Sequence, residues 1–99
     1  MRLLLFSNSA VEDLTQIWNY TFDNWSEERA DQYYLDIIST CTILCQQPEI
    51  GRLYFNFESK IRGLKFKQHI IFYRIQSPDQ IEIVRILHSS MDITTAIAH

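Results

Sequence analysis

The stretch from His69 to His88 constrains the fold most strongly, because it holds two strand-like runs separated by a short turn. Both runs, His69–Ile75 and Ile81–His88, are rich in isoleucine, valine and aromatic residues. The segment between them, Ser77–Gln80, contains a proline and an aspartate, which favour turns. Such a pattern predicts two adjacent antiparallel strands.

Three basic residues lie within these apolar runs or at their end, namely Arg74, Arg85 and His88. Charged groups in such positions must be paired, lie on an exposed face, or serve a function. In a regular strand alternate residues share a face, so Arg85 would lie with Ile83. His88 would lie with Ile86 on the opposite face. A regular strand would therefore keep Arg85 and His88 out of one common site.

The first half of the chain predicts two helices joined by a very short connection. Ser9 and Glu12 have the spacing of a capping box, which predicts a helix from about Ser9 to Asn24. Ser26 followed by two glutamates starts a second helix, which Pro48 ends. Because the connection is a residue or two, the helices must form an antiparallel hairpin.

Each predicted helix carries apolar residues at spacings of three and four, the mark of an amphipathic helix. The expected core-facing stripes are Val11, Leu14, Trp18, Phe22 and Trp25 on the first helix, and Ala30, Tyr34, Ile37, Cys41 and Leu44 on the second. Aromatic side chains dominate burial where they occur, so Trp18, Trp25, Tyr33 and Tyr34 are expected in the core of the hairpin.

The remaining segments complete an α+β pattern. The sequence of Arg2–Phe6 predicts a short buried strand. After the loop at Gln47–Gly51 the pattern becomes strand-like again, and Gly63 within it suggests a bulge or a close backbone approach. We expect one domain over residues 1–99, in which an N-terminal strand and an antiparallel helical hairpin pack on a mostly antiparallel sheet of three to four strands (β-α-α-β-β-β). The tail, residues 91–99, is expected to be mobile or a short extra helix.

The charge is divided unevenly along the chain. Residues 1–51 hold two basic and eight acidic side chains, a net charge of −6, whereas residues 52–99 hold seven basic and four acidic ones, a net charge of +3. This division favours either a basic C-terminal surface for an acidic partner, or two halves whose charges complement each other.

No cofactor or targeting signal is visible in the sequence. Cys41 and Cys45 are four residues apart on a helix, too far for a disulfide, and are interpreted as buried, reduced thiols of a cytoplasmic protein. Leu3–Phe6 is too short for a signal-peptide core or a membrane span. There is no glycine-rich phosphate loop, Ser/His/Asp spacing or metal motif, so no cofactor or metal is expected.

A cluster of Lys, Arg, His and Tyr side chains in the strand half could cleave RNA by acid–base chemistry. The candidates for such a ribonuclease are Lys65, Lys67, Arg85 and His88. The structural interpretation is favoured instead: Arg85 pairs with Asp92 or with an acid of the helices, and His88 makes a structural hydrogen bond.

Several segments, taken in order, resemble the ParE toxins of the RelE/ParE superfamily. They are Asp13–Tyr20 and Trp25–Tyr34 for the helical hairpin, Pro48–Arg52 for the loop after it, and Ile70–Arg74 and Ile83–His88 through Asp92 for the last two strands. The resemblance implies a cytoplasmic toxin that a cognate antitoxin holds inactive. It also implies DNA gyrase as the target, whereas the RelE branch cuts messenger RNA on the ribosome with basic residues and often a C-terminal tyrosine.

Departures from the RelE pattern favour the gyrase branch. Ser89 follows His88 where that branch has a tyrosine, and the tail contains none. Lys65 stands where ParE-like sequences often have arginine, and the two cations are not interchangeable. We expect a non-enzymatic toxin in a hetero-oligomer with its antitoxin, without membrane or sequence-specific nucleic-acid binding; a non-toxic binding module is the further alternative. The predicted partner-binding residues are Tyr33, Ile38, Ile43, Lys65, Lys67, Arg74, Arg85 and His88.

Overall fold

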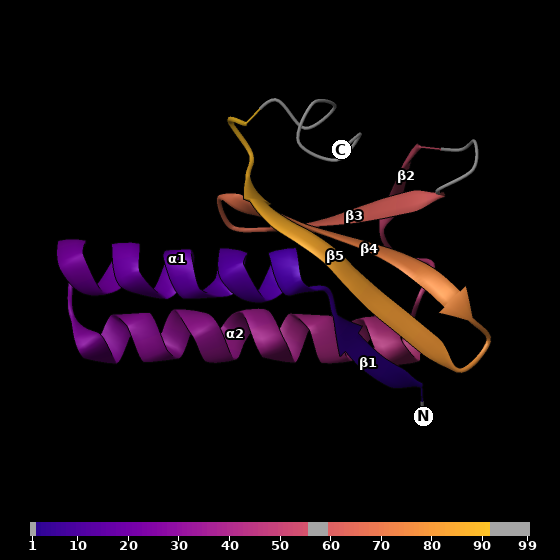
Figure 1. Cartoon of the computed structure of the whole chain (residues 1–99), viewed down its shortest axis with the longest axis horizontal. Coiled ribbons are helices and arrows are strands. Elements are labelled where there is room, and N and C mark those ends of the chain that lie inside the picture. Colours follow the sequence, from indigo (N-terminus) through magenta and orange to yellow (C-terminus); the bar gives the residue numbers. More distant parts are fainter. Residues whose placement is uncertain (1, 56–59, 92–99) are drawn as a thin grey trace.

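The computed structural model describes residues 2–55 and 60–91, in which two helices pack on a five-stranded sheet (Figure 1). The elements are β1 (Leu3–Phe6), α1 (Asn8–Asn24), α2 (Glu27–Gln46), β2 (Arg52–Phe55), β3 (Ile61–Phe66), β4 (His69–Ser77) and β5 (Gln80–His88). The predicted α+β class and helical hairpin are confirmed. The sheet has one strand more than expected, because the runs that begin at Arg52 and Ile61 form separate strands. The predictions for residues 92–99 lie outside the described residues.

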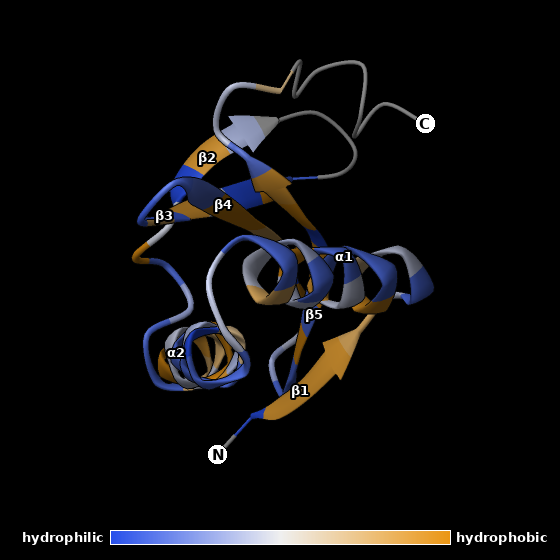
Figure 2. Cartoon of the chain, turned by 90° about the vertical axis from the view of Figure 1, so that its left-hand side faces the viewer, coloured by the Kyte–Doolittle hydropathy of each residue, from blue (hydrophilic) through white to orange (hydrophobic). Residues whose placement is uncertain are grey.

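The sheet has the strand order β1-β5-β4-β3-β2. β2 to β5 pair antiparallel as consecutive hairpins, as the two closing runs predict. β1 alone runs parallel to its neighbour β5, since the helical hairpin returns the chain to the far side of the sheet. β1 is hydrophobic along its whole length and lies beside the two helices (Figure 2). In the described part of the chain, no helix is long and apolar enough to cross a bilayer.

Serine side chains cap both helices, although one is not the predicted serine. The N-cap of α1 is Ser7, whose hydroxyl accepts a hydrogen bond from the backbone N–H of Ala10 at 3.0 Å, so the predicted cap at Ser9 is wrong by two residues. The predicted helix, from about Ser9 to Asn24, begins one residue too late. The same Ser7 hydroxyl donates to the carbonyl of Val84 at 2.7 Å, which ties the helix start to β5. Ser26 caps α2 as predicted, by accepting from the N–H of Arg29.

Two apolar clusters hold the sheet on its opposite faces. The larger lies between the helices and the sheet and contains Ala10, Leu14, Ile37, Cys41, Leu44, Cys45, Ile71, Tyr73, Ile81, Ile83 and Ile86. The smaller is on the outer face and contains Ile61, Ile70, Phe72 and Leu87. Both cysteines are free and buried, as predicted, and burial raises the pKa of the Cys41 thiol to about 12. They are therefore core residues without reactive thiolate character.

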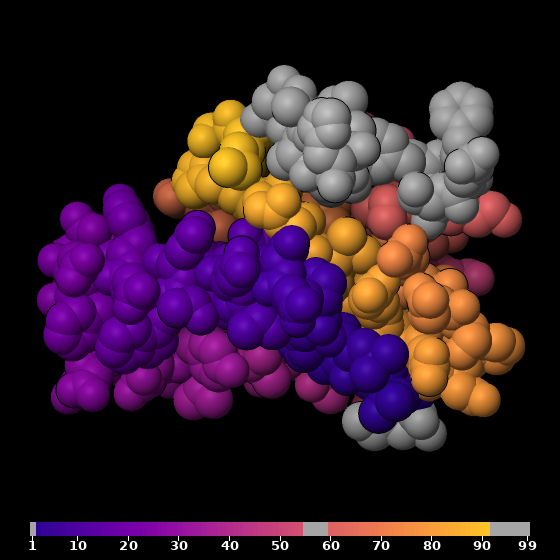
Figure 3. Space-filling view, in the orientation of Figure 1, coloured from indigo at the N-terminus to yellow at the C-terminus, as the bar shows by residue number. Residues whose placement is uncertain are grey.

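The predicted α1 stripe is only partly correct. Leu14 is buried, but Val11, Phe22 and Trp25 are 50%, 46% and 57% exposed. The buried face of α1 is instead formed by Ala10, Asp13 and Leu14 in its first half. For Phe22 and Trp25 the physical reason is that the second half of the hairpin projects beyond the sheet (Figures 1 and 3). On α2, Tyr34 is likewise exposed, contrary to prediction, whereas Ile37 and Leu44 are buried.

The loop from α2 into the sheet is fastened by one tyrosine. The hydroxyl of Tyr73 donates to the carbonyl of Pro48 at 2.7 Å and accepts from the N–H of Gly51 at 2.9 Å. A Cβ atom at position 51 would collide with that hydroxyl, so the loop requires glycine there. At Gly63 an added Cβ would lie 2.6 Å from the ring of Tyr54, which confirms the predicted close approach.

Candidate functional site

A β-bulge in β5 decides where its basic residues point. The register with β4 passes from Tyr73–Ile83 to Phe72–Arg85, so Val84 is an extra residue on β5. Beyond the bulge, alternation along the strand is reversed. Ile86 therefore joins the helix-facing core together with Ile83, whereas a regular strand would place them on opposite faces.

Asp13 of α1 binds the bulge from the helix side. Its carboxylate accepts two hydrogen bonds from the guanidinium of Arg85, with Nε at 2.8 Å and Nη2 at 3.0 Å, and a third from the backbone N–H of Ile86 at 2.9 Å. Asp13 is almost fully buried, and its hydrogen bond raises the pKa of Arg85. The interpretation of Arg85 as an ion-pair residue with an acid of the helices is thus confirmed.

Strand parity grouped the residues of β5 incorrectly, since Ile83 and Ile86 share a face, but the separation that it predicts for Arg85 and His88 agrees with the register of β5 with β4. His88 is the direct cross-strand partner of His69, and the two rings meet edge to face with centroids 5.5 Å apart. His69 in turn contacts Tyr33 of α2. Arg85 pairs with Phe72 of the outer cluster and lies three residues before His88, so the two residues belong to opposite faces of the strand. The guanidinium of Arg85 reaches Asp13 of α1, whereas His88 meets His69 at the junction with α2.

Where α2 meets the sheet, Tyr33, His69, His88 and Ser90 form a histidine junction. The Tyr33 hydroxyl lies 2.8 Å from Nδ1 of His69, and Nδ1 of His88 lies 2.7 Å from the Ser90 hydroxyl. Burial raises the pKa of Tyr33, while a backbone hydrogen bond from Gln68 lowers it. Burial, and then the neighbouring His88, lower the pKa of His69, so this imidazole is neutral at pH 7.

A hydrogen bond from Ser90 fixes the ring tautomer of His88 at this junction. The N–H of Ser90 can only donate, so Nδ1 of His88 accepts, and the proton of the neutral ring is on Nε2. The Tyr33 hydroxyl and Nδ1 of His69 share one hydrogen bond, in which the tautomer of His69 decides which of the two donates. With Nδ1 accepting, His88 presents its Nε2–H group. His88 is exposed and His69 is half-buried.

The two predicted lysines lie in different elements, since Lys65 is on β3 and Lys67 is in the turn between β3 and β4. The ammonium of Lys67 lies 5.4 Å from the ring centroid of Tyr33, next to the histidine junction. Lys65 pairs with Ile70, whose side chain belongs to the outer cluster, and is exposed on that outer face. Of the four ribonuclease candidates, only Lys67 and His88 adjoin the histidine junction without a buried ion pair.

The other predicted partner-binding residues differ in exposure. Arg74 pairs with Glu82 across the outer face at 2.7 Å, with both side chains partly exposed. Ile43 on α2 is 44% exposed, whereas Tyr33 and Ile38 are half-buried against the core. Ile43 is therefore the most accessible apolar member of the set.

Sequence reasoning missed Asp13 and Asp31. Asp13 has the helical spacing of the buried face, since it lies three residues after Ala10 and directly before Leu14, and this position was the available signal. Asp31 accepts a hydrogen bond from the indole of Trp18 at 2.9 Å, a contact between helices that no spacing reveals. Among residues 2–55 and 60–91, no three His, Cys, Asp or Glu side chains gather as a metal site.

This arrangement of two helices on a five-stranded sheet is the fold of a known structure. A chain from the structure described as the chromosomal ParDE TA system from P. aeruginosa matches it with a TM-score of 0.76, covering 89% of this chain and 96% of that chain at 22% identity. At that level of identity the match identifies the fold.

Sequence comparisons identify the family. The family model described as the ParE toxin of the type II toxin–antitoxin system parDE matches residues 4–93. Toxin ParE1 of Mycobacterium tuberculosis is 33% identical over 89 residues, which are 90% of this chain and 91% of that toxin. Toxin ParE1 of Caulobacter vibrioides is 30% identical over 92 residues, 93% of this chain and 94% of that toxin. The chain belongs to the ParE toxin family of type II toxin–antitoxin systems.

Proposed function

We propose that this chain is a cytoplasmic toxin that inhibits DNA gyrase by binding it, is not itself an enzyme, and is neutralised by a cognate antitoxin. Membership of the ParE family supports the toxin assignment. The observation that favours binding over catalysis is the dispersal of the ribonuclease candidates: Arg85 is held by Asp13, and Lys65 lies on the outer face. Acid–base cleavage needs such groups around one reacting phosphate.

The proposed antitoxin contact uses the side of α2 that carries the exposed Ile43, together with the adjoining sheet. Ile43 offers accessible apolar surface, and Tyr33 and Ile38 lie half-buried on the same helix. Arg74 on the outer face and Lys67 and His88 at the junction supply basic groups, in keeping with the +3 charge of residues 52–99. An amphipathic helix together with an extended segment is the kind of partner that uses both surfaces.

Inducible expression separates this proposal from its alternatives. We expect growth to stop, with DNA damage and intact messenger RNA, and we expect the purified chain to trap cleaved DNA on gyrase. Co-expression of the protein from the neighbouring reading frame should restore growth. Unimpaired growth without that protein would instead indicate a non-toxic binding module.

The RelE-type ribonuclease is kept as a second candidate because of the histidine junction. A neutral His69, held by Tyr33 beside His88 and Lys67, could take part in proton transfer. If this candidate is correct, messages are cut within minutes of induction and His88→Ala abolishes the cutting. Such a result would overturn the gyrase proposal.

A further inference from the structure

One side of the helical hairpin carries exposed apolar side chains of α1. Val11, Thr15, Trp18 and Phe22 follow one another along α1 at spacings of four, three and four, and all but Trp18 are exposed. The rings of Trp18 and Phe22 are stacked with centroids 5.2 Å apart. Exposed apolar side chains such as Val11 and Phe22, gathered beside the half-buried ring of Trp18, are typical of a protein-interaction site.

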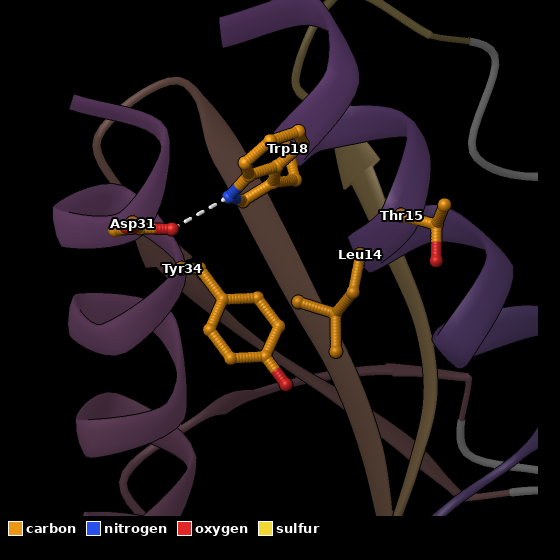
Figure 4. A pocket seen from close by; sticks show the side chains of 5 residues that line it. All are labelled: Leu14, Thr15, Trp18, Asp31 and Tyr34. Carbon is orange, nitrogen blue, oxygen red and sulfur yellow. Dashed lines mark hydrogen bonds between the residues drawn. The ribbon is translucent and has the colours of Figure 1, made fainter. Parts of the chain in front are cut away.

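A hollow of about 340 Å³ opens in this surface between α1 and α2 (Figure 4). It is lined by Leu14, Thr15 and Trp18 from α1 and by Asp31 and Tyr34 from α2. Leu14 is buried and forms the apolar floor. The rings of Trp18 and Tyr34 lie on either side of the entrance, and the carboxylate of Asp31 is drawn toward the indole (Figure 4).

The polar groups of the hollow select a cation. The indole of Trp18 donates its only N–H to Asp31 at 2.9 Å, and this bond uses only part of the carboxylate's capacity to accept. The negative charge therefore lies beside two aromatic faces, which attract cations by their quadrupoles. A guanidinium group suits this geometry because it can stack on an aromatic ring and donate to a carboxylate at the same time.

The surrounding charge favours the same kind of ligand. From Asn8 to Gln46, the two helices and their connection hold seven acidic residues and one basic residue, a net charge of 1 − 7 = −6. Only Asp13 among these acids is neutralised by an ion pair with the sheet in the described structure. Such a field attracts a basic protein segment and repels the phosphates of nucleic acid.

We propose that the hollow lined by Leu14, Thr15, Trp18, Asp31 and Tyr34 binds an arginine side chain of the antitoxin. This identity of the partner rests on the proposed function. The guanidinium pairs with Asp31 between the two rings, and apolar side chains on the same antitoxin segment cover Val11 and Phe22. Arginine anchors surrounded by apolar contacts are typical of the residues that dominate interface energies.

The first experiment tests the hollow without any antitoxin. The chain is titrated with N-acetyl-L-arginine amide while the indole N–H resonances are followed by NMR, and N-acetyl-L-citrulline amide is the uncharged control. We expect a saturable shift of the Trp18 resonance with the arginine compound, and none with citrulline or in Asp31→Asn. Trp25 lies outside the hollow and serves as the internal reference. Equal shifts with both compounds, or no shift at all, would overturn the proposal.

The second experiment tests the occupant by isothermal titration of the toxin with the antitoxin. Asp31→Asn keeps an oxygen for Trp18 but loses the charge, and should weaken binding about tenfold, the size of one desolvated cation–π and ion-pair contact. Asp36→Asn is the matched control on the same helix, since Asp36 accepts from Gln32 outside the hollow, and should change binding by less than about twofold.

The results of the two experiments can be separated. If Asp31→Asn binds the antitoxin as tightly as Asp36→Asn, the antitoxin is not the occupant and the proposal fails. If the unchanged toxin does not bind the antitoxin at all, the proposed function loses its partner, and the assignment of the occupant fails with it. The NMR titration still decides whether the hollow binds a guanidinium.

Discussion

The two ends of α1 differ in a way that the helix itself does not explain. At its N-terminal end, here called the root, Ala10, Asp13 and Leu14 are buried against the sheet. Ser7 and Asp13 bind β5 at and beyond its bulge. At its C-terminal end, here called the tip, the rings of Tyr20 and Trp25 contact each other and are 63% and 57% exposed. Both ends are rich in apolar residues. The difference teaches that burial here is decided by where the sheet ends.

The root also concentrates the polar contacts that fix the hairpin on the sheet. The third hydrogen bond to Asp13 comes from the backbone of Ile86. The bulge thus exposes a backbone donor, and the helix supplies the acceptor that a strand would otherwise provide. At the tip, by contrast, the aromatic rings and acids point outward, available to a partner.

The largest expected effect is at the root. Asp13→Ala removes the acceptor of three hydrogen bonds and leaves the guanidinium of Arg85 and the N–H of Ile86 without it. Breaking a buried ion pair from one side costs about 3–5 kcal/mol, and we expect a loss of that size in the free energy of unfolding, measured in urea. Glu12→Ala, next in sequence and exposed, is the control. A loss below about 1 kcal/mol would show that the root is no more firmly held than the surface.

A second prediction concerns the loop between α2 and β2, which Tyr73 holds in place. Tyr73→Phe removes the hydroxyl that accepts from Gly51 and donates to Pro48, while the ring stays in place. Two backbone groups lose their partner, so we expect a loss of about 1–3 kcal/mol in urea unfolding. Tyr54→Phe on the outer face is the comparison variant. If the two variants are equally stable, the hydroxyl contacts of Tyr73 do not hold the loop.

The contrast between root and tip also explains which parts of the fold the sequence predicts. The hairpin and the strands were predictable because period and caps are local properties of the chain. The buried face of α1 was predicted incorrectly because the helix carries two apolar stripes. The large aromatic residues Trp18, Phe22 and Trp25 mark one stripe more strongly than Ala10 and Leu14 mark the other, which is the buried one. Periodicity shows that a helix has an apolar face, but not whether a sheet extends far enough to cover it.

The candidate site was predicted less completely. The bulge at Val84 moved His88 to the helix side, and no residue type there announces an extra residue in the strand. The hollow depends on Trp18 and Asp31, which are thirteen residues apart on different helices. Such contacts arise from the relative rotation of two packed helices, which a single sequence does not specify.

The contribution of His69, in the histidine junction, to the free energy of unfolding should be lost in acid. Burial lowers the pKa of His69 in the folded chain below its usual 6.5, so the unfolded chain takes up a proton first as the pH falls. This contribution to stability is complete above about pH 6.5 and is lost progressively down to the folded pKa. Urea unfolding at about pH 7.5 and about pH 5.5 should show a fall that is smaller in His69→Gln, since glutamine does not titrate. An equal fall in both chains would exclude His69 as its source.

The smallest change in the free energy of unfolding is expected for a substitution at the tip. Tyr20→Ala removes a large ring, but that ring is mostly exposed and touches Trp25 at a centroid distance of 6.2 Å. Little surface returns to water on unfolding, and alanine is the better helix former, so the free energy of unfolding should change by less than about 0.5 kcal/mol. A loss approaching that of Asp13→Ala would mean that the tip is packed as firmly as the root, and its aromatic side chains would then be structural rather than available to a partner.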